Sequence, residues 1–259
     1  MKVTILGSGS AYGTPMIFNT WGQSSSQNSK NYRTRPSIFL EIEGKNILVD
    51  AGPDLRNQIN SNNINNIDAI FFTHGHYDHI GGIPELPRAA KLVNHQIDIY
   101  ASEETLGEIK NCYSYLFKEK AEAEPSASSL QWHTLPNMGK FATLELEFET
   151  FQVKHHSLHP SAFRYKNFAY VTDWADISEE AIACLQGLEL LVIECNNGMQ
   201  SEKNGHSGFQ EVCKLAEIIK PQQIVLSHLS ARVDYDMMSK ELPKNIQLSY
   251  DGMKLTIND

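Results

Sequence analysis

The feature that most constrains this chain is the run Thr73-His74-Gly75-His76-Tyr77-Asp78-His79, which directly follows a short apolar segment. Three imidazoles and a carboxylate this close together are ligands that suit Zn²⁺ and other first-row divalent ions. The apolar segment Ala69–Thr73 predicts a buried strand, and a tight loop at its end lets the ligands face two neighbouring ions. A surface histidine cluster is the alternative, but ten histidines in 259 residues produce this pattern by chance with a frequency on the order of 10⁻³.

More ligands are needed, because a catalytic zinc site usually takes about three protein ligands plus water. Three other predicted strands end in ligand-type residues: Leu144–Val153 before His155-His156, Phe168–Thr172 before Asp173, and Ile224–Ser227 before His228. A single His or Asp after a strand is more often a cap or turn residue. Strand ends are, however, the usual place for sites in α/β folds, so three such ends favour a shared site.

Strands and helices alternate along the chain, which predicts one α/β domain over residues 1–259 with a mixed sheet. Further strands are predicted at Val3–Leu6, Ser37–Ile42, Ile47–Asp50, Ile97–Ala101 and Leu188–Glu194. Helices are predicted over 103–118, over 178–185 and from Ser207, where Ser207-Gly208-Phe209-Gln210 fits a capping box. Asp251-Gly252 predicts a closing hairpin between Leu248 and Leu255, and the Ala/Glu/Ser-rich stretch 119–129 predicts a mobile loop.

Composition excludes several classes of protein. Lys and Arg number 22 against 31 Asp and Glu, a net charge of −9, which argues against a broad nucleic-acid footprint because that needs clustered cations. No apolar run approaches the ~20 residues of a membrane span, and Val3–Leu6 is too short for a signal-peptide core. Four dispersed cysteines without a CxxC pair indicate buried thiols in a reducing compartment. We therefore expect a cytoplasmic protein with no membrane partner.

The order of these residues resembles the metallo-β-lactamase superfamily, with HxHxDH after a strand, then a histidine, an aspartate and a late histidine. Within it, the chain is most similar to phosphoribosyl 1,2-cyclic phosphate phosphodiesterases. The segments that carry this narrower likeness are Gly7–Pro15, Leu48–Gly52, His156-Ser157, Thr172-Asp173, Asn204–His206, Leu226–Ser230 and Tyr250–Met253. The resemblance implies a four-layer αβ/βα sandwich of two mixed β-sheets, with a dinuclear metal site at one sheet edge.

The resemblance also implies a ligand set for two divalent ions, zinc or manganese. One ion would be held by His74, His76 and His156, the other by Asp78, His79 and His228, with Asp173 bridging them. His155 is an alternative to His156, and we prefer His156 because the family places a serine directly after this ligand, as Ser157 is here. On an alternating strand the two rings point opposite ways, so only one can be the ligand.

The implied function is hydrolysis of a small phosphodiester, such as phosphoribosyl 1,2-cyclic phosphate, by a hydroxide that bridges the two ions. Asp78 and His206 are the expected catalytic residues: Asp78 through the metal, and His206 as proton donor to the leaving oxygen. A solvent-exposed histidine at a helix start is the alternative for His206. Asp50 would hydrogen-bond a ligand histidine or, equally, stabilise its own turn.

One segment near the N-terminus departs from the family. Residues 21–32, WGQSSSQNSKNY, lack the cysteines with which members often hold a separate structural zinc, and predict a solvated loop. Ser8 and Ser10 could line the site mouth. Arg33 and Arg35 could reach a second phosphate, although arginines in such positions are more often solvated.

Three other functions stay open. A nuclease of the tRNA 3′-processing type would need a basic arm and a longer insertion than the 54 residues between Asp173 and His228. A glyoxalase-type thioesterase would carry its third histidine in a Gly-His-Thr turn soon after the first cluster. A non-catalytic metal or metabolite binder would hold metal without turnover. The expected partner is a small phosphorylated substrate, and relatives suggest a homodimer.

Overall fold

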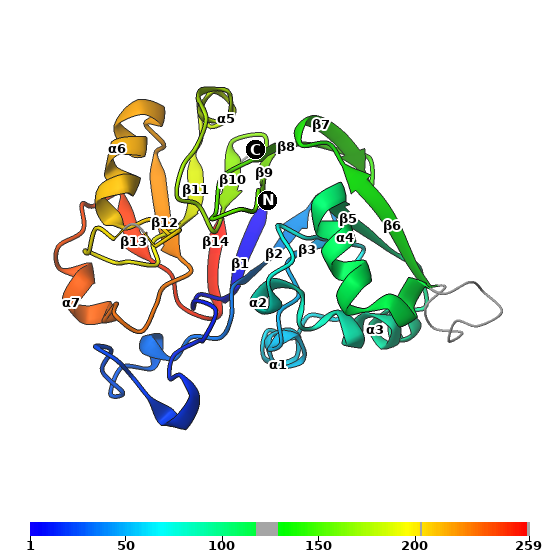
Figure 1. The fold of residues 1–259 in the computed structure, drawn as a ribbon, viewed down its shortest axis with the longest axis horizontal. Helices are drawn as coiled ribbons and strands as arrows, with labels where there is room; N and C mark the ends of the chain where they lie inside the picture. The colour runs from blue at the N-terminus through cyan, green and yellow to red at the C-terminus, as the bar shows by residue number, and fades with distance from the viewer. Residues whose placement is uncertain (118–128, 203, 258–259) are drawn as a thin grey trace.

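Two seven-stranded β-sheets form the centre of the computed structural model, which describes residues 1–117, 129–202 and 204–257 (Figure 1). The strand orders are β14-β1-β2-β3-β4-β5-β6 and β13-β12-β11-β10-β9-β8-β7. Each sheet combines antiparallel and parallel pairs. The predicted α/β class with two mixed sheets is therefore confirmed. The loop predicted at 119–129 lies, apart from residue 129, outside the described residues.

The elements of the first sheet and its helices are β1 (Lys2–Gly7), β2 (Ser37–Ile42), β3 (Lys45–Val49), α1 (Leu55–Ser61), β4 (Ala69–Phe71), α2 (Tyr77–Ile80), α3 (Leu86–Val93), β5 (Ile97–Ser102), α4 (Glu103–Cys112), β6 (Leu130–Leu135) and β14 (Met253–Thr256). Those of the second are β7 (Met138–Thr143), β8 (Leu146–Gln152), β9 (Ser161–Tyr165), β10 (Phe168–Val171), α5 (Glu179–Ala183), β11 (Leu190–Glu194), α6 (Phe209–Ile219), β12 (Gln223–Ser227), α7 (Tyr235–Ser239) and β13 (Ile246–Leu248). None of these described helices is long and apolar enough to cross a membrane.

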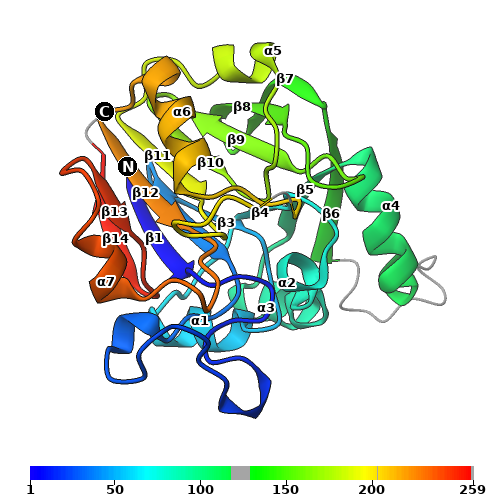
Figure 2. The same ribbon diagram turned by 60° about the vertical axis from the view of Figure 1, so that its left-hand side comes forward.

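Three apolar clusters divide the molecule into four layers. One cluster lies between the two sheets, where Phe71 of β4 and Phe163 of β9 have ring centroids 5.2 Å apart. A second lies between the second sheet and α5 to α7, and a third between the first sheet and α1 to α4. Figure 2 shows these helices on the two outer faces. Helices, sheet, sheet and helices make the predicted αβ/βα sandwich.

Strand residues alternate between these clusters because successive side chains point to opposite faces of a sheet. In β10, Phe168 and Tyr170 face the other sheet, whereas Ala169 and Val171 face the helices. Since both faces of the sheet are covered, the central strands read as continuous apolar runs rather than as alternating ones. This explains why Ala69–Phe71 and Leu190–Glu194 were recognisable as buried strands.

Several element boundaries differ from the prediction. The predicted strand over 144–153 begins later, because Leu144 and Glu145 form the β7–β8 turn with φ of 55° and 67°. Strands β6, β7 and β9 were not predicted. The helix over 103–118 ends as α4 at Cys112 and is followed by a short 3₁₀ turn. Helix α6 is capped at Gly208 rather than Ser207, with Glu211 accepting from the Gly208 N–H at 3.1 Å.

The hairpin predicted around Asp251-Gly252 is wrong, because β13 and β14 belong to different sheets. Asp251 instead ties down the N-terminal loop. One carboxylate oxygen accepts from the backbone N–H and hydroxyl of Ser8 at 2.8 and 2.7 Å, and the other from the N–H and hydroxyl of Thr34, both at 2.7 Å. Because Ser8 is committed to this contact, only Ser10 of the two predicted serines can line a site.

Residues 21–32 are only partly the solvated loop that the sequence predicts. Asn31 is fully buried and donates to Asp234 at 2.9 Å, and the buried Ser24 donates to the Val233 carbonyl at 2.9 Å. Arg33 is also buried, and its guanidinium donates to the carbonyls of Ser230 and Val233 and to Asn31. A polar network therefore joins the N-terminal loop, dark blue in Figure 2, to the segment after β12.

Neither arginine is free to reach a second phosphate. The buried guanidinium of Arg33 binds carbonyls of the chain itself, as described above. Arg35 pairs with Asp54 at 3.2 Å, at the start of α1. The hypothesis of a phosphate contact by Arg33 is thus wrong, and Arg35 is engaged elsewhere.

Asp251→Ala should destabilise the fold. It leaves two backbone N–H groups and two hydroxyls without their acceptor, so we expect the free energy of unfolding to fall by about 2–4 kcal/mol. Urea unfolding followed by circular dichroism measures this loss. The control is Glu41→Ala, which removes an exposed carboxylate 4.0 Å from Lys2 and should change stability by less than about 1 kcal/mol. Equal stability of the two variants would show that the hydrogen bonds of Asp251 to Ser8 and Thr34 do not stabilise the fold.

Candidate metal centre

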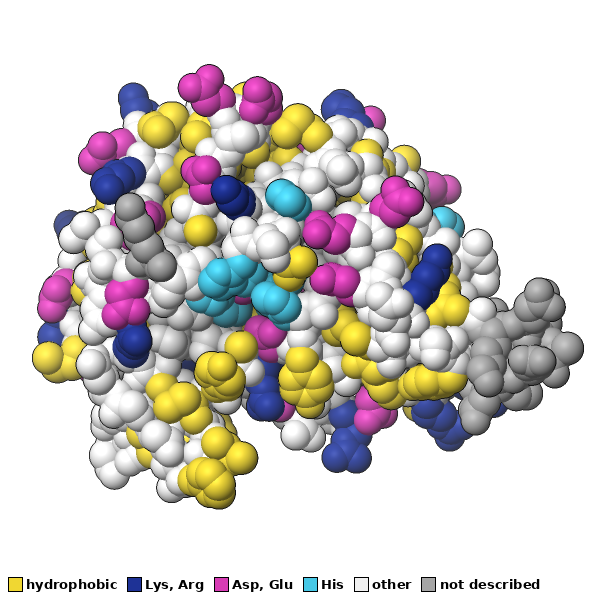
Figure 3. Space-filling model, viewed as in Figure 1, with side chains coloured by type: hydrophobic (Ala, Val, Ile, Leu, Met, Phe, Trp, Pro, Cys, Tyr) yellow, Lys and Arg dark blue, Asp and Glu magenta, His cyan; other side chains and the backbone are white. Residues whose placement is uncertain are grey.

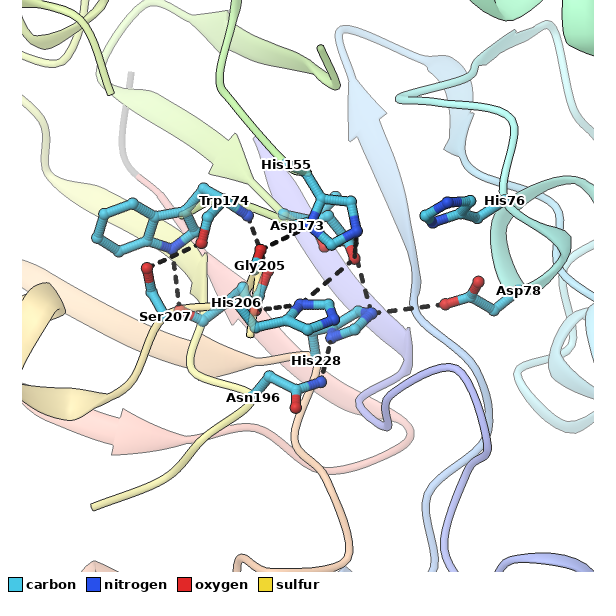
Figure 4. Close-up of polar contacts among 12 residues, drawn as sticks. His76, Asp78, His155, Asp173, Trp174, Asn196, Gly205, His206, Ser207 and His228 are labelled. Atoms are coloured by element: carbon cyan, nitrogen blue, oxygen red, sulfur yellow. Dashed lines mark hydrogen bonds and ion pairs between the residues drawn. The ribbon is translucent and has the colours of Figure 1, made fainter. Parts of the chain in front are cut away.

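Loops that follow strands of both sheets bring the predicted ligands to one edge of the sandwich. The His74–His79 segment follows β4, His155 follows β8, Asp173 follows β10 and His228 follows β12 (Figure 4). Asp173 and His228 both have left-handed backbone, with φ of 50° and 53°. Such values are uncommon outside glycine and cluster at functional sites. Here they turn the chain sharply at the end of a parallel strand, which directs the side chains to the sheet edge.

His74, His76 and His155 form the first group, with one ring nitrogen from each within 4.8 Å of the others. Nε2 of His74 and Nδ1 of His76 are 3.0 Å apart. Ligands of one tetrahedral zinc ion, at bonds of about 2.0–2.1 Å, lie roughly 3.3 Å from one another. The spacing of these nitrogens therefore fits a shared ion.

The structure places His155, and not the preferred His156, beside His74 and His76. The two histidines lie on a tight turn rather than on an alternating strand, with His155 bridged to Leu158 and His156 at φ of 51°. This turn buries His155 against His74 and His76 and leaves His156 exposed. His156 approaches His155 and His206, but it does not join the His74–His76 group.

Asp78, His79 and His228 form the second group, and Asp173 lies between the two groups. One Asp173 oxygen, Oδ2, is 3.1 Å from Nε2 of His79 and 3.4 Å from Nε2 of His228. The other oxygen, Oδ1, is 3.8 Å from Nε2 of His155. Because its two oxygens face different groups, this carboxylate is placed to bridge two ions.

Neighbouring groups orient the ligand rings through the nitrogen that faces away from the centre. Nδ1 of His79 donates to Asp50 at 2.7 Å, and Nδ1 of His155 donates to the Gly205 carbonyl at 2.7 Å. Nδ1 of His228 lies 3.0 Å from the Asn196 amide. The contacts of His79 and His155 fix the tautomer and leave Nε2 of these two rings as the candidate ligand atom. The structure therefore shows Asp50 hydrogen-bonded to the candidate ligand His79, one of the two alternatives from the sequence.

The pKa shifts indicate a site that attracts positive charge. Burial lowers the pKa of His74, and it lowers the pKa of His155 to about 4, so both rings are neutral at pH 7. Burial opposes ionisation of Asp173, but His228 and His79 outweigh it and hold its pKa well below the usual range. Burial likewise lowers the pKa of His228, yet Asp173 and Asp78 raise it to about 9. The carboxylate half of the site therefore attracts positive charge.

Two buried nitrogen atoms show that divalent ions fit this donor set. Nε2 of His79 and Nε2 of His228 are inaccessible to solvent and do not meet hydrogen-bond geometry with any described residue. Carboxylate oxygens nevertheless lie 3.1 to 3.5 Å from them. A buried polar atom without a partner is costly. A cation among these donors would satisfy all of them at once.

His206 lies beside the metal ligands and is held by a carboxylate that the sequence reasoning missed. Nδ1 of His206 donates to Oε1 of Glu194 at 2.8 Å, and the Trp174 N–H donates to Oε2 of Glu194 at 3.0 Å. Glu194 is fully buried at the end of β11. Burial lowers the pKa of His206, but the hydrogen bond and charge of Glu194 raise it overall. The sequence does carry a signal for Glu194, because this charged residue ends the apolar run LLVIE at the same sheet edge.

A cavity of about 760 Å³ opens over this centre. Figure 3 shows histidine side chains gathered in the middle of this face, with hydrophobic side chains beside them. The lining of the cavity includes His76, Asp78, His155, His156, Asp173 and His206, and also Ser10, Tyr12, Met16, Tyr77 and Arg232. This volume lies within the usual range for small-molecule sites. Arg232 is the one Lys or Arg among the described lining residues.

Asp50→Asn should weaken metal binding without unfolding the protein. The amide replaces a charged acceptor for His79 and for the Thr73 N–H, and loss of such orienting groups typically costs about 10- to 100-fold in metal affinity. Competition with a fluorescent zinc chelator measures the change. Asp98→Asn is the matched control, because Asp98 also pairs with a histidine, His133 at 2.9 Å, but outside the metal centre. Unchanged affinity in Asp50→Asn would contradict the assigned role.

Comparisons with known proteins agree with this geometry. The model of the beta-lactamase superfamily domain matches residues 45–229. The crystal structure of a diphosphatase from the PhnP family superposes with a TM-score of 0.88 at 27% identity, covering 99% of this chain and 98% of that one.

Two curated relatives share part of their length with this chain. An octanoyltransferase of Porphyromonas gingivalis is 28% identical over 263 residues, which cover 100% of this chain and 52% of that protein. The exodeoxyribonuclease WalJ of Streptococcus pneumoniae is 31% identical over 180 residues, which cover 65% of this chain and 61% of that protein. The chain thus spans about half to three fifths of the length of these relatives.

Proposed function

Because this chain belongs to the metallo-β-lactamase superfamily, we propose that it is a hydrolase of small phosphodiesters that uses two divalent ions. The observation that carries the proposal is the position of Asp173 between two groups of three ligands. One oxygen faces His79 and His228 and the other faces His155. A dinuclear centre under an open cavity suits displacement at phosphorus, because paired ions stabilise both the attacking and the leaving oxygen.

In the first ligand group, His74, His76 and His155 would hold one ion; in the second, Asp78, His79 and His228 would hold the other, with Asp173 shared. The ions would be zinc or manganese. Bound ions supply Lewis-acid stabilisation of phosphate charge and a nucleophile at neutral pH. Asp78 acts as a ligand and is needed for catalysis for that reason. A centre with local positive charge accepts a phosphate despite the net charge of −9.

His206 would deliver the proton to the leaving oxygen. Its Nδ1 is committed to Glu194, so Nε2 is the nitrogen that can donate to a substrate in the cavity that His206 lines. Glu194 favours the protonated ring, which is the form a general acid needs before the bond breaks. Glu194 is thus a positioning residue, and Trp174 fixes it from the other side.

One feature supports a small phosphodiester over a polynucleotide. The described lining of the cavity offers one cation, Arg232, whereas a polynucleotide needs a track of Lys and Arg. The name octanoyltransferase belongs to a protein about twice as long as this chain, so it is not transferred here. An octanoyl thioester nevertheless makes a suitable counter-substrate, because its hydrolysis would indicate a thioesterase.

Metal removal gives the direct test of the proposed function. Protein loaded with Zn²⁺ or Mn²⁺ should hydrolyse bis(p-nitrophenyl) phosphate, lose at least about 100-fold of the rate on chelation, and regain it when metal returns. Asp78→Ala and His76→Ala should abolish the activity, measured by p-nitrophenolate absorbance. Rates in these variants equal to that of the parent protein would contradict the proposal. Hydrolysis of the octanoyl thioester alone would indicate a thioesterase instead.

A further inference from the structure

The cavity over the metal centre has two chemically different parts. Its floor is built from histidine and carboxylate side chains, including His76, Asp78 and Asp173. Its rim carries large apolar side chains, and Tyr12 and Tyr77 both line it although 74% and 63% of their surface is exposed. Single exposed hydrophobic residues are ordinary, but grouped ones beside a polar site mark a binding surface. A ligand that fits both parts has an anionic end and a flat apolar end.

The tyrosine on the metal side is held close to the reacting centre by the chain itself. Tyr77 lies between the candidate ligands His76 and Asp78 and begins α2. Its backbone carbonyl accepts from the Gly81 N–H at 2.7 Å, which fixes the start of this short helix. The Tyr77 ring can change rotamer, but its Cα cannot move away from the ligands on either side.

The other tyrosine, Tyr12, is presented by a tight turn of the glycine-rich loop. The Gly13 N–H donates to the Ser10 carbonyl at 2.8 Å, and Gly13 has φ of 65°, so the turn places Tyr12 at its tip. The Ser10 N–H donates to the carbonyl of Leu229, the residue after His228, at 3.1 Å. Both rings are therefore tied to segments that carry candidate metal ligands, and neither hydroxyl makes a hydrogen bond with a described residue.

We propose, resting on the proposed phosphodiesterase function, that the substrate is a small nucleotide whose base stacks on Tyr12 and Tyr77 while its phosphate lies over the metal centre. Aromatic rings bind bases through their flat faces and tolerate different bases. The cavity of about 760 Å³ suits a ligand of mononucleotide size. The single described cation of its lining, Arg232, disfavours a longer chain of phosphates. The two tyrosines thus determine substrate specificity.

Binding of adenosine 5′-monophosphate and ribose 5-phosphate to zinc-loaded protein tests this proposal by calorimetry. The two probes share the sugar phosphate and differ in the base. We expect the nucleotide to bind at least about tenfold more tightly, and Tyr12→Ala or Tyr77→Ala to weaken it by about 5- to 100-fold. Binding of ribose 5-phosphate should stay unchanged. Tyr12→Phe and Tyr77→Phe keep the ring and should stay within about twofold of the parent protein.

Tyr115→Ala is the control, because Tyr115 is an exposed tyrosine outside the cavity lining. Equal affinity for the two probes, or nucleotide binding that survives both alanine substitutions, would overturn the proposal. Tighter binding of a 12-nucleotide DNA strand with steep salt dependence would also overturn it in favour of a polynucleotide. The assay needs no turnover, so a protein that prefers the nucleotide but hydrolyses no phosphodiester would refute the proposed function alone.

Discussion

His155→Ala is expected to remove one of the two divalent ions and lower phosphodiesterase activity by more than about 100-fold. Loss of an orienting neighbour already costs 10- to 100-fold, and a ligand should cost more. His155 is buried against His74 and His76. The remaining two histidines cannot complete a catalytic site of about three protein ligands. Metal content by mass spectrometry and the hydrolysis rate together measure the effect.

His156→Ala provides the matched comparison, because it removes an imidazole one position further along the same turn. His156 is exposed. Its substitution should therefore leave the metal content at two ions and the hydrolysis rate within a few fold of that of the parent protein. If His156→Ala instead lost the ion and His155→Ala kept it, the ligand expected from the family pattern would be right. The distinction drawn from burial would then be wrong.

His206→Ala should reduce kcat by about 10²- to 10⁴-fold while both ions stay bound, because a positioned general acid typically contributes this much. His206 is hydrogen-bonded to Glu194 at 2.8 Å and approaches Asp173 only at 3.8 Å. Its position suits proton transfer, and because its ring also lies within 4.8 Å of ligand atoms of His155 and Asp173, the metal content must be measured together with the rate. Steady-state kinetics on substrates with good and poor leaving groups measure the effect, and the loss should be larger for the poor leaving group.

Glu194→Gln supplies the control for this role. The amide still accepts from His206 but no longer favours its protonated form, so kcat should fall less than in His206→Ala. Loss of a metal ion in His206→Ala would make His206 a ligand. An equal loss for good and poor leaving groups would exclude it as the proton donor.

Much of the fold could be predicted because its signals are local. Buried strands such as Ala69–Phe71 and Leu190–Glu194 are short apolar runs, and residues at or after their ends line the candidate metal centre. The wrong prediction of a hairpin at Asp251 shows what local sequence signals cannot determine. The same Asp-Gly pair can turn a hairpin or let the chain cross between two sheets, and only the pairing of β14 with β1 decides between them. Strands β6 and β9 were not predicted because buried and exposed residues do not alternate regularly in them, and β7 because its alternating residues are exposed or only half-buried.

The residues of the candidate metal centre, apart from the choice between His155 and His156, lie together as the sequence predicts. The ligand types and strand ends are visible in the sequence, but the choice between His155 and His156 depends on a turn whose geometry comes from contacts with distant segments. Gly205, 50 residues away, accepts the hydrogen bond that orients His155. Glu194 escaped for a similar reason, since its partner His206 lies in a separate loop. The homodimer and the cytoplasmic location stay predictions.

Anomalous X-ray scattering from crystals of the metal-loaded protein tests the central claim most directly. The expected result is two peaks, one among His74, His76 and His155 and one among Asp78, His79 and His228. The carboxylate of Asp173 should lie between them. A single peak would contradict the dinuclear centre, and a peak coordinated by His156 in place of His155 would contradict the ligand assignment.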